Sequence, residues 1–179
     1  MALQTMIEMT RAAELLLERD DYHILIHGYP DGDTIGSGYA LCRALRSLGK
    51  RASVVCAHEI PGVYSYITDL EVQEFEPHTI VAVDVADLKL LGGDPLEYEG
   101  RVLLTVDHHA TNRRFAEYTW LDPQAAATCE MIYSLILALG VKPDVKMAEA
   151  LYTGVSTDTG CFRFSNTTPQ THRIAARLM

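Results

Sequence analysis

The sequence has little positive charge and no low-complexity tract. Its 179 residues include 15 Lys and Arg against 24 Asp and Glu, a formal net charge of −9. General electrostatic binding to long nucleic acid requires a basic face, so this balance argues against a protein that binds long duplexes. It leaves open a short phosphorylated ligand, because bound metal ions can supply positive charge locally.

The sequence also lacks paired cysteine motifs and long apolar runs. None of its four cysteines has Cys-x-x-Cys spacing, and each lies among apolar neighbours (Cys42, Cys56, Cys129 and Cys161). This pattern favours buried free thiols in a reducing compartment over disulfides or a zinc site. No apolar run approaches membrane-spanning length, and the first residues do not resemble a secretory leader. We therefore expect a cytoplasmic protein with no membrane contact.

Apolar residues are abundant, at 48% of the chain, and the length suits one domain with a real core. Apolar patterns predict strands at 22–26, 51–57, 79–83, 101–106 and 118–121, and helices at 3–17, 39–48, 63–67, 124–139, 145–154 and from 169 onward. The strands are continuously apolar, which is typical of parallel strands buried on both faces. We predict a layered α/β domain of Rossmann-like type, with a mainly parallel central sheet and helices on both faces.

Polar side chains directly follow three of the predicted strands. They are His27, Asp31 and Asp33 in the first loop, Asp84 after the third strand, and Asp107, His108 and His109 after the fourth. In open parallel sheets, the carboxyl ends of the strands share one edge, where ligands bind. A further carboxylate, Asp158, follows a predicted helix in a turn-forming segment. We therefore expect these groups to converge.

Such a cluster is costly without a counterion. Two unit charges 4 Å apart repel by about 4 kcal/mol at an effective dielectric of 20. Several such pairs would rival the roughly 5–15 kcal/mol stability of a small domain. Solvated loop residues are one explanation, and divalent cations are the other. Mixed Asp and His ligands suit Mn²⁺, with Zn²⁺ or Co²⁺ as alternatives and Mg²⁺ less at home beside imidazole.

Four motifs then occur in order: His-x-x-Pro-Asp-Gly-Asp-x-x-Gly-Ser, a strand-terminal Asp, Asp-His-His and a late Asp-Thr-Gly. Together they resemble the motifs of the DHH phosphoesterases, over about residues 7–178. The Pro-Asp-Gly-Asp form and compact spacing are similar to the branch of bifunctional oligoribonucleases and pAp phosphatases, the nanoRNases (pAp is 3′-phosphoadenosine 5′-phosphate). The resemblance implies hydrolysis of short oligoribonucleotides, pAp or both by a two-metal mechanism.

The resemblance also implies a role for each residue of the motifs. His27 and Asp31 would hold a first metal ion, Asp33, His108 and Asp158 a second, and Asp84 would bridge both. Asp107 would orient a ligand, and His109 would face the substrate phosphate. Three other residues are candidates for phosphate contact: Ser37, Asn112 and Arg163. Ser37 has a plainer alternative as a helix cap, and Arg163 has one as a partner in a surface ion pair.

Several alternatives stay open at this point. A cyclic-dinucleotide phosphodiesterase and an inorganic pyrophosphatase share the chemistry, and a phosphate-binding module without catalysis is the non-enzyme alternative. A homodimer is compatible with the sequence. Members of the family carry a second, C-terminal substrate-binding domain, whereas this sequence stops at Met179 inside a predicted helix. We expect Ile174 and Leu178 on that helix to have little to pack against, so residues 1–179 would be the catalytic domain of a longer protein.

Overall fold

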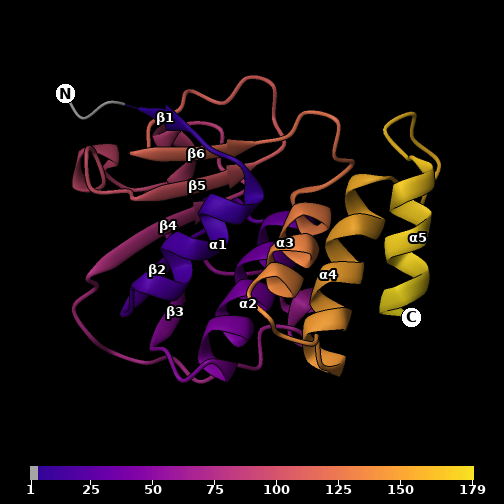
Figure 1. Cartoon of the computed structure of the whole chain (residues 1–179), viewed down its shortest axis with the longest axis horizontal. Coiled ribbons are helices and arrows are strands. Elements are labelled where there is room, and N and C mark those ends of the chain that lie inside the picture. The colour runs from indigo at the N-terminus through magenta and orange to yellow at the C-terminus, as the bar shows by residue number, and fades with distance from the viewer. Residues whose placement is uncertain (1–3) are drawn as a thin grey trace.

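Six parallel strands form one sheet in the computed structural model, which describes residues 4–179 (Figure 1). The strands lie in the order β1-β6-β5-β4-β2-β3, and every neighbouring pair is parallel. Their bounds are β1 (Thr5–Met6), β2 (Tyr22–Leu25), β3 (Ala52–Val55), β4 (Thr79–Val83), β5 (Leu104–Asp107) and β6 (Tyr118–Leu121). The predicted layered α/β fold is confirmed, and the sheet is parallel throughout.

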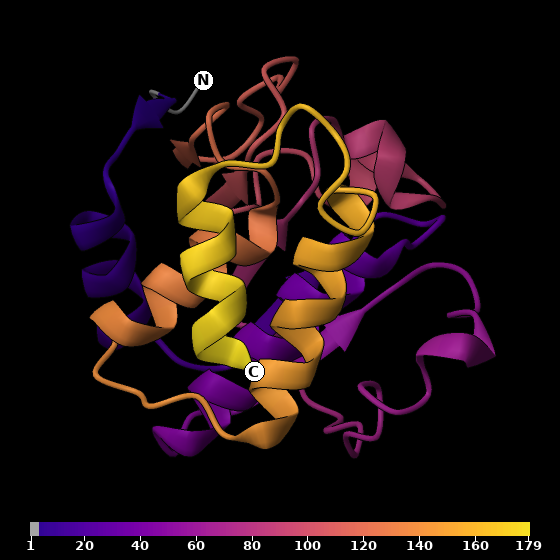
Figure 2. The same ribbon diagram turned by 90° about the vertical axis from the view of Figure 1, so that its right-hand side faces the viewer.

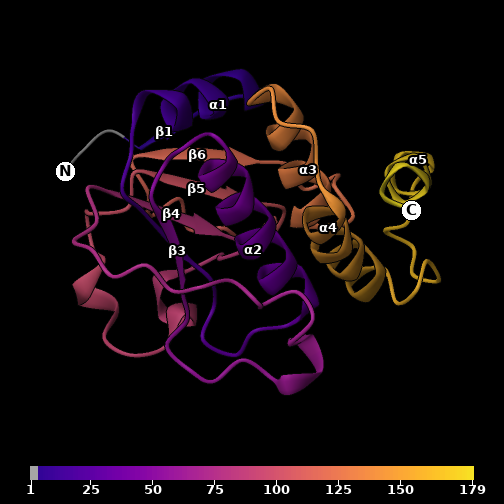
Figure 3. The same ribbon diagram turned by 90° about the horizontal axis from the view of Figure 1, so that it is seen from below.

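The helices are distributed unequally over the two faces of this sheet. Five α-helices stand on one side: α1 (Met9–Glu18), α2 (Gly32–Ser47), α3 (Thr128–Ala138), α4 (Val145–Asp158) and α5 (Pro169–Leu178) (Figure 3). The opposite face packs against the short 3₁₀ helix η2 (Leu88–Leu91) and its flanking loops, where η3 (Pro95–Glu97) also lies. Helices were expected on both faces of the sheet. The structure has α-helices on one face and only short 3₁₀ helices on the other. A further 3₁₀ helix, η1 (Gly62–Tyr64), replaces the short helix expected at 63–67.

The α-helices themselves form layers. α2 and α3 contact the sheet, α4 packs on both of them, and α5 packs outside α3 and α4 (Figure 2). α2 and α4 approach closely because Gly36 has no side chain: a Cβ there would lie 2.3 Å from the carbonyl oxygen of Ala150. This contact brings the start of α2 beside the end of α4.

Three predicted helix starts are wrong, and one of them is that of α3, which begins at Thr128 and not at residue 124. Residues 5–6 form the edge strand β1 beside β6, and the helix expected at 3–17 begins only at Met9; Leu3 lies outside the described residues. α2 begins at Gly32 instead of residue 39, because the side chain of Asp31 caps it by accepting hydrogen bonds from the backbone N–H groups of Asp33 and Thr34. Glycine has a poor helix propensity, so three glycines in the first two turns concealed this start.

The C-terminal part also differs from expectation. α4 runs to Asp158, which is therefore the last residue of a helix and does not lie in a separate turn. Ile174 on α5 is only 2% exposed within the main core, and Leu178 packs against that core. The expectation that α5 lacks packing partners is wrong.

The remaining composition-based expectations concern cysteines and membranes. All four cysteines are free, and Cys42 and Cys129 are buried as expected, but Cys161 is exposed. Over residues 4–179, no helix has both the length and the apolar character needed to cross a membrane.

Candidate metal centre

The predicted ligands meet at the carboxyl edge of the sheet and the adjoining helix ends. His27 follows β2, Asp31 and Asp33 lie at the start of α2, Asp84 follows β4, His108 follows β5, and Asp158 ends α4. Their potential ligand atoms form two groups in which all atoms lie within 4.8 Å of one another: His27 with Asp31 and Asp84, and Asp33 with His108 and Asp158. A third, overlapping group joins Asp84 and His108 to His109. The expected convergence is therefore present.

Asp84 belongs to the first group and also faces His108 of the second. Its Oδ2 is 4.0 Å from Nε2 of His27, and its Oδ1 is 3.8 Å from Nε2 of His108. The two oxygens of one carboxylate thus face different groups. The Asp84 backbone is left-handed, with φ +58°, a conformation that Asp tolerates better than most residues. The backbone turns at this residue, where β4 ends and the Asp84 side chain enters the cluster.

The carboxylates of the cluster are buried and crowded. Asp33 and Asp84 are 1% and 3% exposed. Burial, followed by the nearby Asp158 carboxylate, raises the pKa of Asp33 to about 7. Burial and the neighbouring Asp33 raise the pKa of Asp84 well above its usual value, and burial also raises the pKa of Asp158. These shifts reflect the free energy needed to ionise carboxylates in this place.

Asp31 behaves differently because it is better solvated and better bonded. Burial alone would raise its pKa, but the His27 imidazole, whose Nε2 lies 3.7 Å from Oδ1, and hydrogen bonds from the helix N–H groups outweigh that effect and lower it. Among the described residues, the ion-pair partners of the four cluster carboxylates are histidines, with no Lys or Arg. Buried acids without a Lys or Arg partner fit a site whose positive charge is supplied by metal.

A backbone carbonyl group orients His108, whose imidazole faces both Asp33 and Asp158. Nδ1 of His108 donates a 3.1 Å hydrogen bond to the carbonyl oxygen of Ala125, and Nε2 lies 3.4 Å from an oxygen of Asp158. Metal-binding imidazoles commonly donate their second N–H to a carbonyl in this way, which fixes the tautomer and the ring.

Thr128, which our sequence reasoning missed, supports both groups. Its backbone N–H donates to Oδ2 of Asp33 at 2.6 Å, and its hydroxyl donates to Oδ1 of Asp84 at 2.8 Å. The next N–H, of Cys129, donates to Oδ1 of Asp33 at 2.9 Å. The positive end of the α3 dipole thus faces a buried carboxylate. The pattern predicted this helix to begin at residue 124, so it gave no signal that Thr128 starts it.

The conformation of His109 is fixed by Asp107, which is fully buried. Nδ1 of His109 donates to Oδ1 of Asp107 at 2.7 Å, and the amide of Asn112 donates to Oδ2 at 2.6 Å. These bonds outweigh burial, which acts in the opposite direction, and lower the pKa of Asp107. The same bond raises the pKa of His109 to about 9. Nδ1 is therefore engaged with Asp107, and Nε2 is the ring nitrogen that this bond leaves free.

Two of the three candidate phosphate contacts are wrong. Ser37 is fully buried inside α2, with Oγ 3.3 Å from Sγ of Cys129, so it neither caps the helix nor reaches a phosphate. The side chain of Asn112 is used within the protein, on Asp107 and the carbonyl oxygen of Val85. Arg163 is exposed in the loop after α4, where its Nε donates to the carbonyl oxygen of Gly160, and its phosphate contact stays a prediction.

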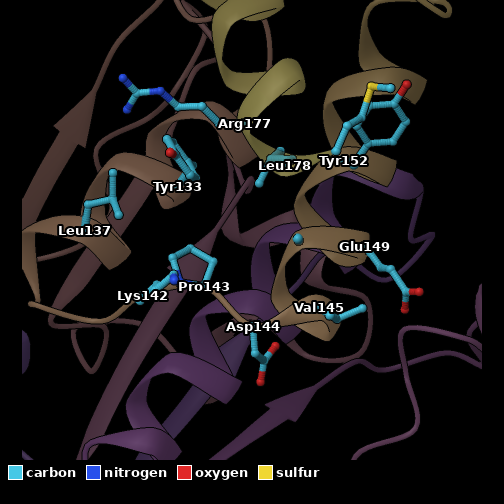
Figure 4. A pocket seen from close by; sticks show the side chains of 12 residues that line it. Tyr133, Leu137, Lys142, Pro143, Asp144, Val145, Glu149, Tyr152, Arg177 and Leu178 are labelled. Carbon is cyan, nitrogen blue, oxygen red and sulfur yellow. The ribbon is translucent and has the colours of Figure 1, made fainter.

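A pocket of about 410 Å³ opens beside the cluster. Its lining combines cluster residues with a loop and η2: His27, Tyr29, Asp31, Asp84, Ala86, Lys89, Leu90, His109, Thr111 and Asp158. A larger cavity of about 610 Å³ lies between α3, α4 and α5, where Tyr133, Tyr152 and Leu178 line it (Figure 4). No His lines that second cavity, so a mixed Asp and His site exists only in the first of these two pockets.

A parallel sheet with His and Asp gathered at its carboxyl edge defines an α/β domain with a candidate metal centre. Residues 22–155 match the model of the DHH family, N-terminal domain. The chain belongs to the DHH family.

Relatives with curated names agree with this assignment. The chain is 40% identical over 163 residues to the bifunctional oligoribonuclease and PAP phosphatase NrnA of Thermus thermophilus, a match that covers 88% of this chain and 49% of the relative. It is 30% identical over 165 residues to the Bacillus subtilis protein of the same name, covering 87% and 52%. The chain thus spans about half the length of these relatives.

Solved structures show the same fold. An exopolyphosphatase-related protein from Bacteroides fragilis superimposes with a TM-score of 0.85 at 25% identity, covering 95% of this chain and 55% of that one. Exonuclease RecJ bound to manganese superimposes with a TM-score of 0.63 at 16% identity, covering 94% and 46%.

Proposed function

We propose that this chain is the catalytic domain of a metal-dependent phosphoesterase that hydrolyses short oligoribonucleotides, pAp or both. The observation that carries the proposal is Asp84, whose two oxygens face two separate ligand groups. Membership of the DHH family and identity to proteins named oligoribonuclease and PAP phosphatase support the substrate class.

In this proposal, two ions share the cluster. His27 and Asp31 would hold one ion, the second group (Asp33, His108 and Asp158) would hold the other, and Asp84 would contact both. Bound divalent ions supply a nucleophile at neutral pH and stabilise charge on phosphate. The mixture of carboxylate and imidazole favours Mn²⁺, with Co²⁺ and Zn²⁺ next and Mg²⁺ less suited. Cytoplasmic location and a homodimer stay predictions.

His109 acts on the substrate in this proposal. Asp107 holds its ring through Nδ1, which leaves Nε2 to donate a hydrogen bond to a phosphate oxygen. Asn112 holds Asp107 in turn. Such prealigned donors stabilise developing charge without reorganising during the reaction. Asp107 and Asn112 are therefore positioning residues, and His109 is the one that touches the substrate.

An inorganic pyrophosphatase is less well supported. Pyrophosphate carries dense negative charge and no apolar group, whereas the pocket lining includes one Lys, no Arg and the apolar surfaces of Tyr29, Ala86 and Leu90. A cyclic-dinucleotide phosphodiesterase fits this lining as well as an oligoribonuclease does, so substrates of both kinds belong in the test.

The test combines metal counting with a substrate panel. The purified chain, dialysed with Mn²⁺, should retain two ions, and Asp84→Asn should retain none. The chain and a longer form of the protein are then assayed on pAp, RNA of two to five nucleotides, cyclic dinucleotides and pyrophosphate. Metal binding without hydrolysis by either form would indicate a binding module. Absence of bound metal would overturn the proposal altogether.

A further inference from the structure

An exposed aromatic ring lies at the mouth of the pocket beside the metal cluster. Tyr29, in the loop between His27 and Asp31, is 84% exposed and lines this pocket. Behind it stands the imidazole of His58, with the two ring centroids 4.7 Å apart and the planes tilted by 40°. One side of the Tyr29 ring is therefore supported by protein, while the rest of its surface is open to solvent.

The loop that carries Tyr29 is held firmly through its neighbour Gly28. Nδ1 of His58 donates a 2.6 Å hydrogen bond to the Gly28 carbonyl oxygen, and the Gly28 N–H donates a 2.7 Å bond to the carbonyl oxygen of Leu90. A Cβ at Gly28 would lie 2.7 Å from the carbonyl oxygen of Leu91, so the loop lies directly against η2. The backbone next to Tyr29 is thus held in place, and its ring rests on His58, which reduces the entropy lost on binding.

The chemistry of the lining indicates the kind of ligand. Its volume of about 410 Å³ lies within the range of small-molecule sites, about 300–1,000 Å³. Tyr29 and Leu90 supply an exposed apolar wall, and Lys89 is the only Lys or Arg among the lining residues. A ligand made of phosphate groups alone would leave this apolar wall uncovered. This wall instead suits a ligand with a flat apolar part beside its phosphate.

We propose that Tyr29, backed by His58, is the surface on which a nucleobase of the substrate stacks while its phosphate lies at the Asp and His cluster. This inference rests on the proposed function, because that function places the phosphate. Stacking tolerates any base, since every base has a π-face. The subsite therefore selects nucleotides over sugar phosphates and pyrophosphate without selecting a particular base. Tyr29 determines specificity and takes no part in bond cleavage.

The experiment compares two ligands that differ only in the base. Binding of AMP and of ribose 5-phosphate to the Mn²⁺-loaded chain is measured by calorimetric titration. AMP should bind about tenfold more tightly, or better, as expected for one stacked base. Tyr29→Ala should bring the AMP affinity down to that of ribose 5-phosphate, and Tyr29→Phe should keep the preference. Tyr66→Ala, at an exposed tyrosine outside the pocket, is the matched control and should also keep it.

Each outcome is distinguishable from failure of the proposed function. If both ligands bind only with Mn²⁺ present but equally well, or if Tyr29→Ala retains the preference for AMP, the stacking proposal is overturned and the phosphoesterase proposal stands. If neither ligand binds to the metal-loaded chain, the stacking proposal is overturned, and the substrate panel on the longer form of the protein decides the phosphoesterase proposal separately. Metal content measured on every variant separates lost stacking from damage to the adjacent Asp31.

Discussion

The hydroxyl of Thr128 donates a 2.8 Å hydrogen bond to Oδ1 of Asp84, the same oxygen that faces His108. The backbone N–H of Thr128 simultaneously holds Asp33, so one buried residue at the start of α3 orients carboxylates of both ligand groups. Supporting bonds of this kind fix carboxylates before metal arrives and increase their affinity for it.

Thr128→Val should therefore weaken metal binding while keeping the shape of the site. The substitution removes the hydroxyl bond to Asp84 but retains the backbone N–H that holds Asp33. Loss of a supporting partner typically lowers metal affinity by about 10–100-fold. Calorimetric titration with Mn²⁺ measures the effect, and Thr128→Ser, which keeps the hydroxyl, serves as control. An unchanged dissociation constant for Thr128→Val would show that the hydroxyl has no such role.

Metal should also stabilise the whole fold. A ligand that binds only the folded state at a hundredfold excess over its Kd adds about 2.7 kcal/mol to the free energy of unfolding. At about 2–4 °C per kcal/mol for a chain of this size, chelation should lower Tm by roughly 5–10 °C. Thermal melts with EDTA and with added Mn²⁺ test this, with Asp84→Asn as the variant that should not respond. Melting that is the same in both conditions would contradict the metal-centre proposal.

The bridging position should be the most sensitive one. Asp84→Asn should abolish binding of both ions, whereas Asp33→Asn should weaken mainly the ion held with His108 and Asp158. Because burial disfavours the charged form of Asp84, the asparagine variant should be at least as stable as the wild type when both are free of metal. Metal counting and melting in EDTA measure the two effects. Retention of one ion by Asp84→Asn would exclude a bridging role.

The chain of bonds from Asn112 through Asp107 to His109 should affect turnover and not metal content. His109→Ala should keep both ions and lose activity. Asn112→Leu should leave a buried oxygen of Asp107 unpaired, lowering stability by about 1–3 kcal/mol and reducing kcat because the His109 ring is held less firmly. Steady-state kinetics with metal counting distinguish these effects. If His109→Ala lost an ion while His108→Ala kept both, the assigned roles of the two histidines would be reversed.

The convergence of the residues that follow strands could be predicted from the sequence. The carboxyl ends of parallel strands share one edge of the sheet, whatever the order of the strands within the sheet. The sequence did not allow prediction of features that depend on contacts between distant segments. Ser37 has the spacing of a cap for a helix that begins at residue 39, whereas α2 begins seven residues earlier, at Gly32, and is capped by Asp31. Thr128 supports residues 44 and 95 positions away, and no local pattern records such a contact.

The open pocket leads to a prediction about the other half of the relatives. His109 is 46% exposed and Tyr29 is 84% exposed, so the proposed substrate site is open to solvent in this chain. Correct positioning of reactants can contribute about 7–11 kcal/mol to a rate, and a half-open site can use only some of it. We predict that residues 1–179 bind Mn²⁺ but turn over pAp and short RNA slowly. A protein extended to the length of the curated relatives should show kcat/KM higher by orders of magnitude, measured side by side at equal metal occupancy. Tyr29→Ala should raise KM in the extended protein as well, because the proposed stacking surface, the Tyr29 ring, belongs to residues 1–179. Equal kcat/KM for the two forms would show that this domain alone is the catalytic unit.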